Sequence, residues 1–195
     1  MTINEYWEGE WNRRIKGEGQ VECNTEKAEI ILTNIAHRKF FNDKQILDIG
    51  CGPAFHALRI AQEKPDYKER WYGIDLSPRA VEFFKSHGLQ GEHGSIYEFT
   101  SNGRKFDVFL LLDTLEHISD RNKLAEKINE LSNDKFIIFG NIPLYIDKKD
   151  LESGMEHMMN INVLVDFIHK AGCQKLDHYI YGVRGYPYMI WSAYA

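Results

Sequence analysis

Apolar residues along the chain occur in two alternating kinds of segment. Short runs such as residues 106–112 are almost continuously apolar, which is typical of a strand buried on both faces. Between them, apolar residues recur at helical spacing, as do Leu124, Ile128 and Leu131. This alternation predicts a parallel sheet covered by helices on both faces. The predicted strands are residues 45–49, 71–74, 90–96, 106–112, 135–139, 174–181 and 188–195, and the predicted helices are residues 55–61, 78–87, 124–131 and 161–171.

The end of the chain departs from this alternation. The last two predicted strands are joined by residues 182–187, with no helix between them, so we expect an antiparallel hairpin. The sequence also predicts where one helix begins and where another ends. Ser77 before Pro78 is a typical N-cap, and Gly172 follows the last predicted helix as its C′ residue. The predicted fold class is therefore α/β, a Rossmann-like three-layer α/β/α sandwich with a seven-stranded, mostly parallel sheet.

The length of 195 residues fits one domain. We expect a single domain over residues 1–195, with a core at 41–195 and a helical segment at 1–40. Aromatic residues cluster at the start of that segment, in Tyr6, Trp7 and Trp11. They are expected either to form a lid over bound ligands or to attach the segment to the sheet.

Composition argues against several classes of partner. The net charge is −5, with 24 basic against 29 acidic residues, whereas nucleic-acid binding favours a basic surface. The three cysteines, Cys23, Cys51 and Cys173, lack metal-type spacing and indicate a reducing compartment. No apolar run is long enough to span a membrane, and the N-terminus does not resemble a signal peptide. We expect a cytoplasmic monomer or homodimer that binds neither nucleic acid nor membrane.

A glycine-rich turn follows the first predicted strand. Gly50 and Gly52 permit positive φ angles and let the backbone approach a ligand closely. Asp75 ends the next strand, where a carboxylate can accept hydrogen bonds from both hydroxyls of an adenosine ribose. A dinucleotide is disfavoured because Phe55 occupies the position of the third fingerprint glycine and Asp48 would repel phosphate.

These segments resemble a known family. Residues 46–54, and Asp75 within 72–78, look like motifs I and II of class I S-adenosylmethionine-dependent methyltransferases, and residues 106–118 resemble the strand-four motif. The terminal hairpin is also typical of this family. The resemblance implies the sheet order 3-2-1-4-5-7-6 and S-adenosyl-L-methionine as the cofactor.

The resemblance also implies roles for matching positions. Asp48 would lie near the methionine amino group, Asp75 would hold the ribose hydroxyls and Leu76 would lie against the adenine. Two positions depart from the family pattern, because Ala54 replaces a motif glycine and Ser95 stands where an acid often contacts the adenine. The implied cofactor-binding residues are Asp48, Gly50, Cys51, Gly52, Asp75, Leu76, Ser95, Ile96, Asp113 and Leu115.

Two histidines are candidates for catalysis. His117 follows the fourth strand and would act as a general base, since an unperturbed histidine titrates near neutral pH. His157 lies in a region that often covers the acceptor in this family. Asp113, Glu116 and His117 are also similar to the Glu-x-x-Glu-His metal site of ubiquinone-pathway and small-RNA methyltransferases, which could hold Mg²⁺ or Mn²⁺. The first acid is shortened here, so we expect no metal.

Two functions remain open. The favoured one is methyl transfer to a small-molecule acceptor at oxygen or nitrogen. The alternative is a non-catalytic, cofactor-binding partner protein, because the chain also resembles the small methyltransferase-like proteins of methionine biosynthesis. The fold itself does not identify the acceptor.

Overall fold

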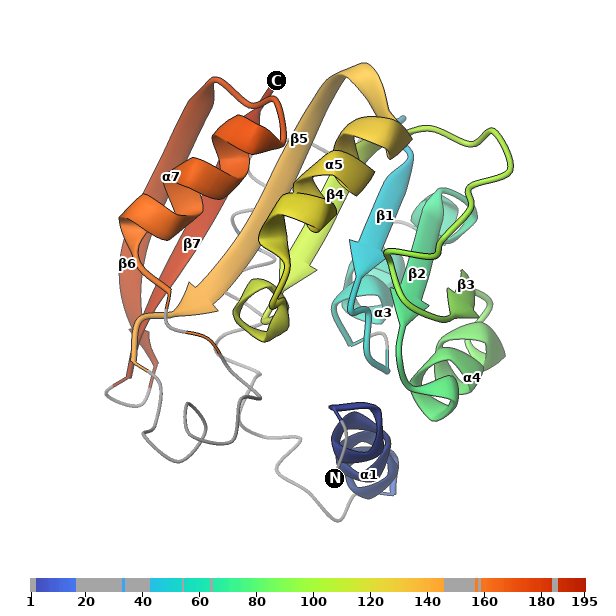
Figure 1. Ribbon diagram of the computed structural model, residues 1–195. Coiled ribbons are helices and arrows are strands. Elements are labelled where there is room, and N and C mark those ends of the chain that lie inside the picture. Colours follow the sequence, from blue (N-terminus) through green and yellow to red (C-terminus); the bar gives the residue numbers. More distant parts are fainter. Residues whose placement is uncertain are drawn as a thin grey trace. The chain divides into compact units, whose positions relative to one another are not determined.

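Seven strands form one sheet in the order β3-β2-β1-β4-β5-β7-β6, which confirms the predicted fold class and strand order (Figure 1). The structure, a computed structural model, describes residues 3–16, 33, 43–53, 55–63, 65–145, 157, 159–183 and 186–195. Strands β1 and β3 pair parallel with β2, and β4 pairs parallel with β5. Strand β7 lies antiparallel between β5 and β6. The chain divides into two compact units, Met1–Phe99 and Thr100–Ala195.

The first unit carries the glycine-rich turn. Its helix α4 begins where the sequence predicts, because the Ser77 hydroxyl accepts a hydrogen bond from the Ala80 amide at 3.1 Å. Helix α4 packs on β2 and β3 through the buried side chains of Val81 and Phe84. The elements of this unit are α1 (Ile3–Ile15), β1 (Ile46–Ile49), α3 (Phe55–Glu63), η2 (Pro65–Glu69), β2 (Trp71–Asp75), α4 (Pro78–Ser86) and β3 (Gln90–His93).

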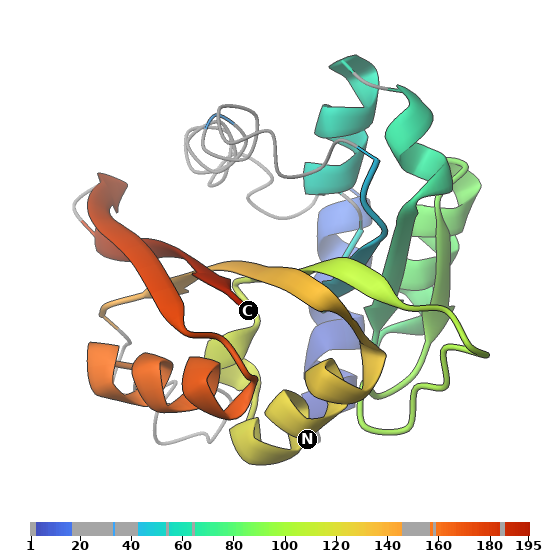
Figure 2. The same cartoon turned by 90° about the horizontal axis from the view of Figure 1, so that it is seen from above.

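The second unit contains the longest strands. Helices α5 and α7 lie side by side on the same face of its strands (Figures 1 and 2). The Phe167 ring of α7 meets the Trp191 ring of β7 edge-on at 6.4 Å, so this face is closed by aromatic packing. The elements of this unit are β4 (Phe106–Leu112), η3 (Leu115–His117), α5 (Arg121–Leu131), β5 (Ser132–Pro143), α7 (Ile161–Lys170), β6 (Lys175–Val183) and β7 (Tyr186–Tyr194).

Several predicted boundaries were wrong. The hairpin strands extend into the predicted connection, since Gly182 pairs with Pro187 and Val183 with Tyr186. Strand β5 is also longer than predicted at both ends. Strand β3 ends at His93, because Gly94 has a φ of +156° and its amide turns back to the Asp75 carbonyl at 2.9 Å. The 3-10 helix η2 was not predicted.

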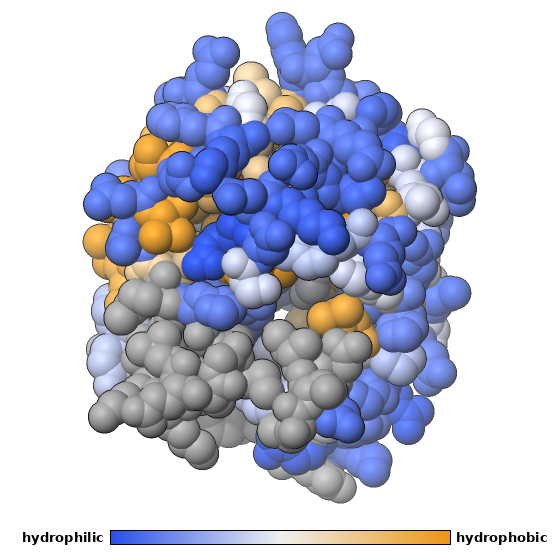
Figure 3. Space-filling model, in the orientation of Figure 1, coloured by the Kyte–Doolittle hydropathy of each residue, from blue (hydrophilic) through white to orange (hydrophobic). Residues whose placement is uncertain are grey.

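The exposed surface in Figure 3 is mostly hydrophilic where residues are described, with apolar side chains gathered over α7 and β6. Ile161 in α7 and Ile180 in β6 are large hydrophobic residues exposed to solvent. Within the described residues, none of the helices is both long and apolar enough to cross a membrane.

Candidate cofactor site

The glycine-rich turn joins β1 to α3 through two residues with positive φ. Gly50 has a φ of +71° and Gly52 a φ of +51°, conformations that L side chains rarely adopt. The turn is attached to β2, because the amides of Gly50 and Cys51 both donate to the Ile74 carbonyl, at 2.8 and 3.2 Å. The backbone conformation that the sequence predicts for this turn is therefore present.

Asp75 connects the glycine-rich turn to helix α4. Its Oδ2 accepts from the Gly52 amide at 2.9 Å, and its Oδ1 accepts from the Ser77 amide at 2.8 Å. The side chain is buried, and this burial raises the pKa of the carboxyl although both backbone hydrogen bonds oppose the rise. A carboxylate has about four lone-pair positions. Two are used here, so each oxygen keeps one that fits a hydroxyl of a vicinal diol.

Asp48 is a second buried acid, in the middle of β1. Its exposed fraction is 3%, and its Oδ2 accepts a hydrogen bond from the Trp71 indole N–H at 3.1 Å. The pKa of this carboxyl is raised to about 7, mainly by burial and also by the nearby Asp75, although the hydrogen bond from Trp71 lowers it. A charged Asp48 is thus costly without a positive partner, and a ligand ammonium would supply one.

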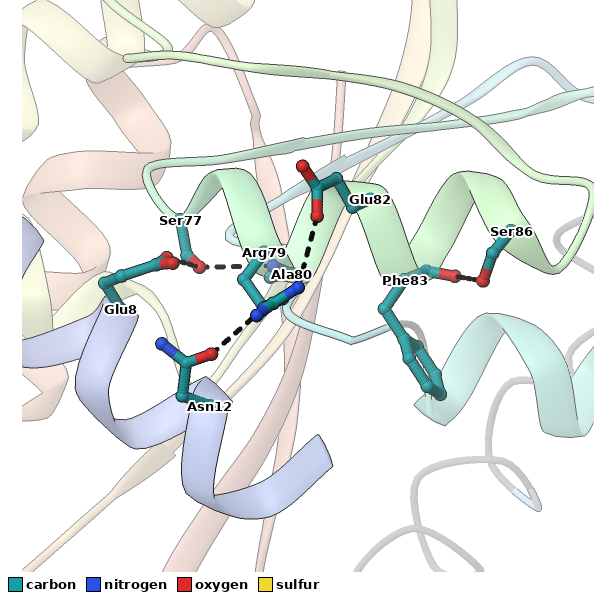
Figure 4. A network of polar contacts seen from close by, with 8 residues as sticks. All are labelled: Glu8, Asn12, Ser77, Arg79, Ala80, Glu82, Phe83 and Ser86. Carbon is teal, nitrogen blue, oxygen red and sulfur yellow. Dashed lines mark hydrogen bonds and ion pairs between the residues drawn. The ribbon is translucent and has the colours of Figure 1, made fainter. Parts of the chain in front are cut away.

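Helix α1 packs against α4 (Figure 4). The Ser77 hydroxyl donates to a carboxylate oxygen of Glu8, and the Arg79 guanidinium donates to Asn12 Oδ1 at 3.0 Å. The Trp11 ring lies against Gly52, and the Trp7 ring stacks on Trp11 at 5.5 Å. The sequence alone did not predict the Glu8 and Asn12 contacts.

Trp11 leaves almost no room above Gly52. A Cβ on Gly52 would lie 3.1 Å from Trp11 Cζ2 and 3.2 Å from Cη2. The indole nitrogen of Trp11 is buried and has no hydrogen-bond partner among the residues that the structure describes. The Trp11 ring of helix α1 therefore covers the glycine-rich turn, and its indole N–H has no acceptor among the described residues.

We predict that Gly52→Ala destabilises the protein by about 2–3 kcal/mol, from the strain of a positive φ and from the clash with Trp11. Thermal unfolding should show a melting temperature lower by about 4–10 °C. Gly103→Ala is the matched control, because Gly103 has a φ of +83° and no neighbour within 4 Å of an added Cβ. An equal loss in both variants would show that the Trp11 contact contributes nothing.

The remaining predicted cofactor residues of this unit differ in accessibility. Leu76 is half-buried, and its carbonyl contacts His93 Nε2 at 3.1 Å. The Ser95 hydroxyl accepts from the Tyr97 amide at 3.3 Å, which leaves its proton for a ligand. Ile96 is buried. The Cys51 sulfur lies 2.7 Å from the place a Cβ on Gly73 would take, so this side chain fills space against β2.

In the second unit, Asp113 and Asn141 bind each other at the ends of β4 and β5. The Asn141 amide donates to Asp113 Oδ1 at 2.6 Å, and the Asp113 backbone amide donates to Asn141 Oδ1 at 3.3 Å. Asn141 is fully buried, and Asp113 has a φ of +50°, which is unusual for a residue with a side chain. Asn141 fixes both the backbone and the carboxylate of Asp113, a role the sequence analysis missed. The next predicted residue, Leu115, is fully buried.

The two candidate histidines belong to neighbouring segments. The His157 amide donates to the Glu116 carbonyl at 2.7 Å, one residue before His117 in η3. Both histidines are half-buried. In the described ranges, no group of three or more histidine, cysteine, aspartate or glutamate side chains is arranged to hold a metal ion. Cys23 and Ala54 lie outside the described residues.

Comparison with known sequences agrees with this geometry. Residues 46–135 match the family model described as a methyltransferase domain. A ubiquinone biosynthesis O-methyltransferase from Azorhizobium caulinodans is 30% identical over 95 residues, covering 46% of this chain and 36% of that protein. A mitochondrial one from Schizosaccharomyces pombe is 29% identical over 104 residues, covering 49% and 36%. The matched region thus spans about a third of the length of these curated relatives.

Solved structures share the fold at low identity. Magnesium protoporphyrin IX methyltransferase from Synechocystis, with bound S-adenosylhomocysteine, has a TM-score of 0.73 at 16% identity, covering 98% of this chain and 97% of that one. The plantazolicin methyltransferase, also with S-adenosylhomocysteine, has a TM-score of 0.65 at 13% identity, covering 98% and 93%. These neighbours show that the chain shares their fold, and the family match over residues 46–135 agrees with the predicted resemblance to class I S-adenosylmethionine-dependent methyltransferases.

Proposed function

We propose that the protein transfers a methyl group from S-adenosylmethionine to a small-molecule acceptor, at oxygen or nitrogen. The observation that carries the proposal is Asp75, whose two oxygens are each held by one backbone amide. That arrangement leaves one acceptor position on each oxygen for the ribose diol, next to the turn in which Gly50 and Gly52 have positive φ angles. The methyltransferase-domain match over residues 46–135 supports the same function.

The residues of the first unit fit the cofactor by its chemistry. Asp75 would hold the ribose hydroxyls, and Asp48 would neutralise the ammonium of the methionine part. Leu76 and Ser95 would contact the adenine. When bound, the cofactor supplies an activated methyl group on a sulfonium, so the protein mainly has to position the acceptor and exclude water. Trp11 supports the exclusion of water, because its ring covers Gly52 in the glycine-rich turn and is itself stacked on Trp7.

The acceptor side of the proposal rests on residues of the second unit. His117 and His157 would contact the acceptor, with Asp113 and Leu115 on the methionine side. The acidic composition supports a small acceptor in place of a polynucleotide. A single cytoplasmic domain, as monomer or homodimer, remains part of the proposal.

His117 is proposed as the general base that removes the acceptor proton. His117→Ala should lower kcat by about 10²–10⁴-fold without changing the Kd for S-adenosylhomocysteine, because the base acts only on the acceptor. The rate is measured as S-adenosylhomocysteine released with an active acceptor. His169→Ala, an exposed histidine in α7, is the control and should keep full activity. An unchanged kcat in His117→Ala would assign His117 a packing role only.

The direct test of the function is methyl transfer from labelled S-adenosylmethionine to a panel of small alcohols, phenols, acids and amines, after binding of S-adenosylhomocysteine has been measured by calorimetry. Binding followed by transfer to a panel member supports the proposal. Binding without transfer to any class of acceptor would favour the non-catalytic partner protein. A folded protein that binds neither form of the cofactor would contradict both the enzymatic function and the role as a cofactor-binding partner.

A further inference from the structure

Trp11 of helix α1 carries a hydrogen-bond donor without an acceptor. Its indole nitrogen is buried and has no hydrogen-bond partner among the residues that the structure describes. A buried N–H without a partner destabilises the folded state, and most such groups in proteins are satisfied by protein atoms, by water or by a ligand. The Trp11 N–H is therefore a candidate for a contact with a ligand.

The ring of Trp11 brings this donor to the glycine-rich turn. A Cβ on Gly52 would lie 3.1 Å from Cζ2, 3.2 Å from Cη2 and 3.6 Å from Cε2 of the ring. The indole nitrogen is covalently bonded to Cε2, so the donor is one bond away from the edge of the ring that contacts the turn. The hydrogen bond between Glu8 and Ser77 holds this part of α1 beside the start of α4 (Figure 4). The donor thus belongs to the candidate cofactor site.

The backbone amides of the turn are already bonded within the protein. Among residues 50–53, the first two amides donate to the Ile74 carbonyl and the third donates to the Asp75 carboxylate. The fourth residue is Pro53, which has no amide hydrogen. A ligand group that accepts hydrogen bonds therefore needs a donor from outside the turn, and the Trp11 N–H is placed to supply it.

The charges beside Trp11 favour an acceptor that is negatively charged. The Arg14 guanidinium lies over the Trp11 ring, 4.9 Å from its centroid. Arg13 and Arg14 both form ion pairs with Glu10, so these three side chains together carry one net positive charge. The Glu8 carboxylate of the same helix is directed to α4, where it accepts a hydrogen bond. A positive charge next to an N–H donor attracts an anionic group more strongly than a neutral one.

We propose that the Trp11 indole N–H donates a hydrogen bond to the carboxylate of S-adenosylmethionine. In the proposed function, on which this inference rests, Asp75 receives the ribose hydroxyls and Asp48 receives the ammonium. The carboxylate is the anionic group of the cofactor, and it is bonded to the same carbon atom as the ammonium. It therefore requires a donor close to the glycine-rich turn, which Asp48 precedes by two residues. Helix α1 would then hold the cofactor as well as cover it.

The test removes the donor and keeps the shape of the ring. Trp11 is replaced site-specifically by benzothienylalanine, in which sulfur takes the place of the indole N–H. Calorimetry measures the binding of S-adenosylhomocysteine and of methylthioadenosine, which lacks the amino-acid part. We expect S-adenosylhomocysteine to bind about 10–100-fold more weakly, because a hydrogen bond to a charged group is lost, and methylthioadenosine to bind as it does to the wild type.

Trp191 provides the matched control, because its indole nitrogen is also buried without a partner in the described part of the chain but belongs to β7 of the second unit. The same replacement at Trp191 should leave the binding of both ligands unchanged. A second measurement separates binding from packing. Since the Trp11 N–H has no acceptor among the described residues, its removal should not lower the melting temperature measured without ligand.

Three results would overturn the inference while the proposed function stands. Unchanged binding of S-adenosylhomocysteine to the Trp11 variant would show that the indole N–H does not contact the cofactor. Equal weakening of both ligands would assign the contact to the adenosine part. A lower melting temperature together with weaker binding of both ligands would leave Trp11 a packing role only. If the wild-type protein does not bind S-adenosylhomocysteine, the proposed function is contradicted and this inference falls with it.

Discussion

Asp75→Ala is expected to weaken the binding of S-adenosylmethionine and S-adenosylhomocysteine by at least about 100-fold. The variant would lose the two charge-assisted hydrogen bonds that we propose between Asp75 and the ribose, each contributing about 1.5–3 kcal/mol. It also releases the amides of Gly52 and Ser77, which Asp75 holds at 2.9 and 2.8 Å. Calorimetric titration of wild type and variant with each form of the cofactor measures the change.

Two controls make this result specific. Asp134→Ala removes an exposed aspartate from the second unit and should bind the cofactor like wild type. Circular dichroism should show that Asp75→Ala keeps its secondary structure. If the folded variant binds with wild-type affinity, Asp75 is not the ribose ligand and the cofactor site lies elsewhere.

Asp48→Asn is expected to stabilise the ligand-free protein at high pH. The pKa of Asp48 is raised from the ordinary 3.8 to about 7, mainly by burial, so folding at intermediate pH requires the carboxyl to take up a proton, and folding at high pH leaves a charge in a buried place. At 1.36 kcal/mol for each pKa unit, the wild-type protein loses about 4 kcal/mol as the pH rises through this interval. Asparagine carries no charge and keeps an oxygen acceptor for the Trp71 indole. The expected gain in melting temperature at pH 8.5 is about 10 °C.

The pH dependence of this gain follows from the direction of the shift. A raised pKa in the folded state means that the unfolded carboxyl releases its proton first, from about pH 4 upward. The stabilising effect of asparagine should therefore be absent near pH 4, grow up to about pH 7 and stay constant above it. Melting temperatures of both proteins between pH 4 and 8.5 test this, and a difference that does not vary with pH would contradict it.

The features that depend on neighbours in the sequence were predictable. The glycine-rich turn and the cap at Ser77 follow from backbone requirements that only a few residue types meet. The structure confirms the positive φ at Gly50 and Gly52 and the start of α4 after Ser77. The strand order was also predicted, although from the resemblance to a family and not from periodicity.

The contacts that depend on pairing between distant segments were not predictable. Asn141 is one polar residue in an apolar strand, and only the positions of β4 and β5 bring it to Asp113. Tyr181 and Tyr188 stack because the hairpin register places them opposite each other. The sequence pattern did not predict this register, because it indicated a loop at residues 182–187. A shift of one residue would turn these rings to the other face of the sheet.

The Ser77 hydroxyl restricts which amino acids position 77 can tolerate during evolution. It accepts a hydrogen bond from the Ala80 amide at the start of α4 and donates a hydrogen bond to the Glu8 carboxylate of α1. Aspartate is an equally good cap but has no proton to donate, and it would add a negative charge beside Glu8 and Asp75. Alanine and glycine would lose both bonds. Threonine alone among the common caps keeps the same hydroxyl, so this buried position is constrained by two helices at once.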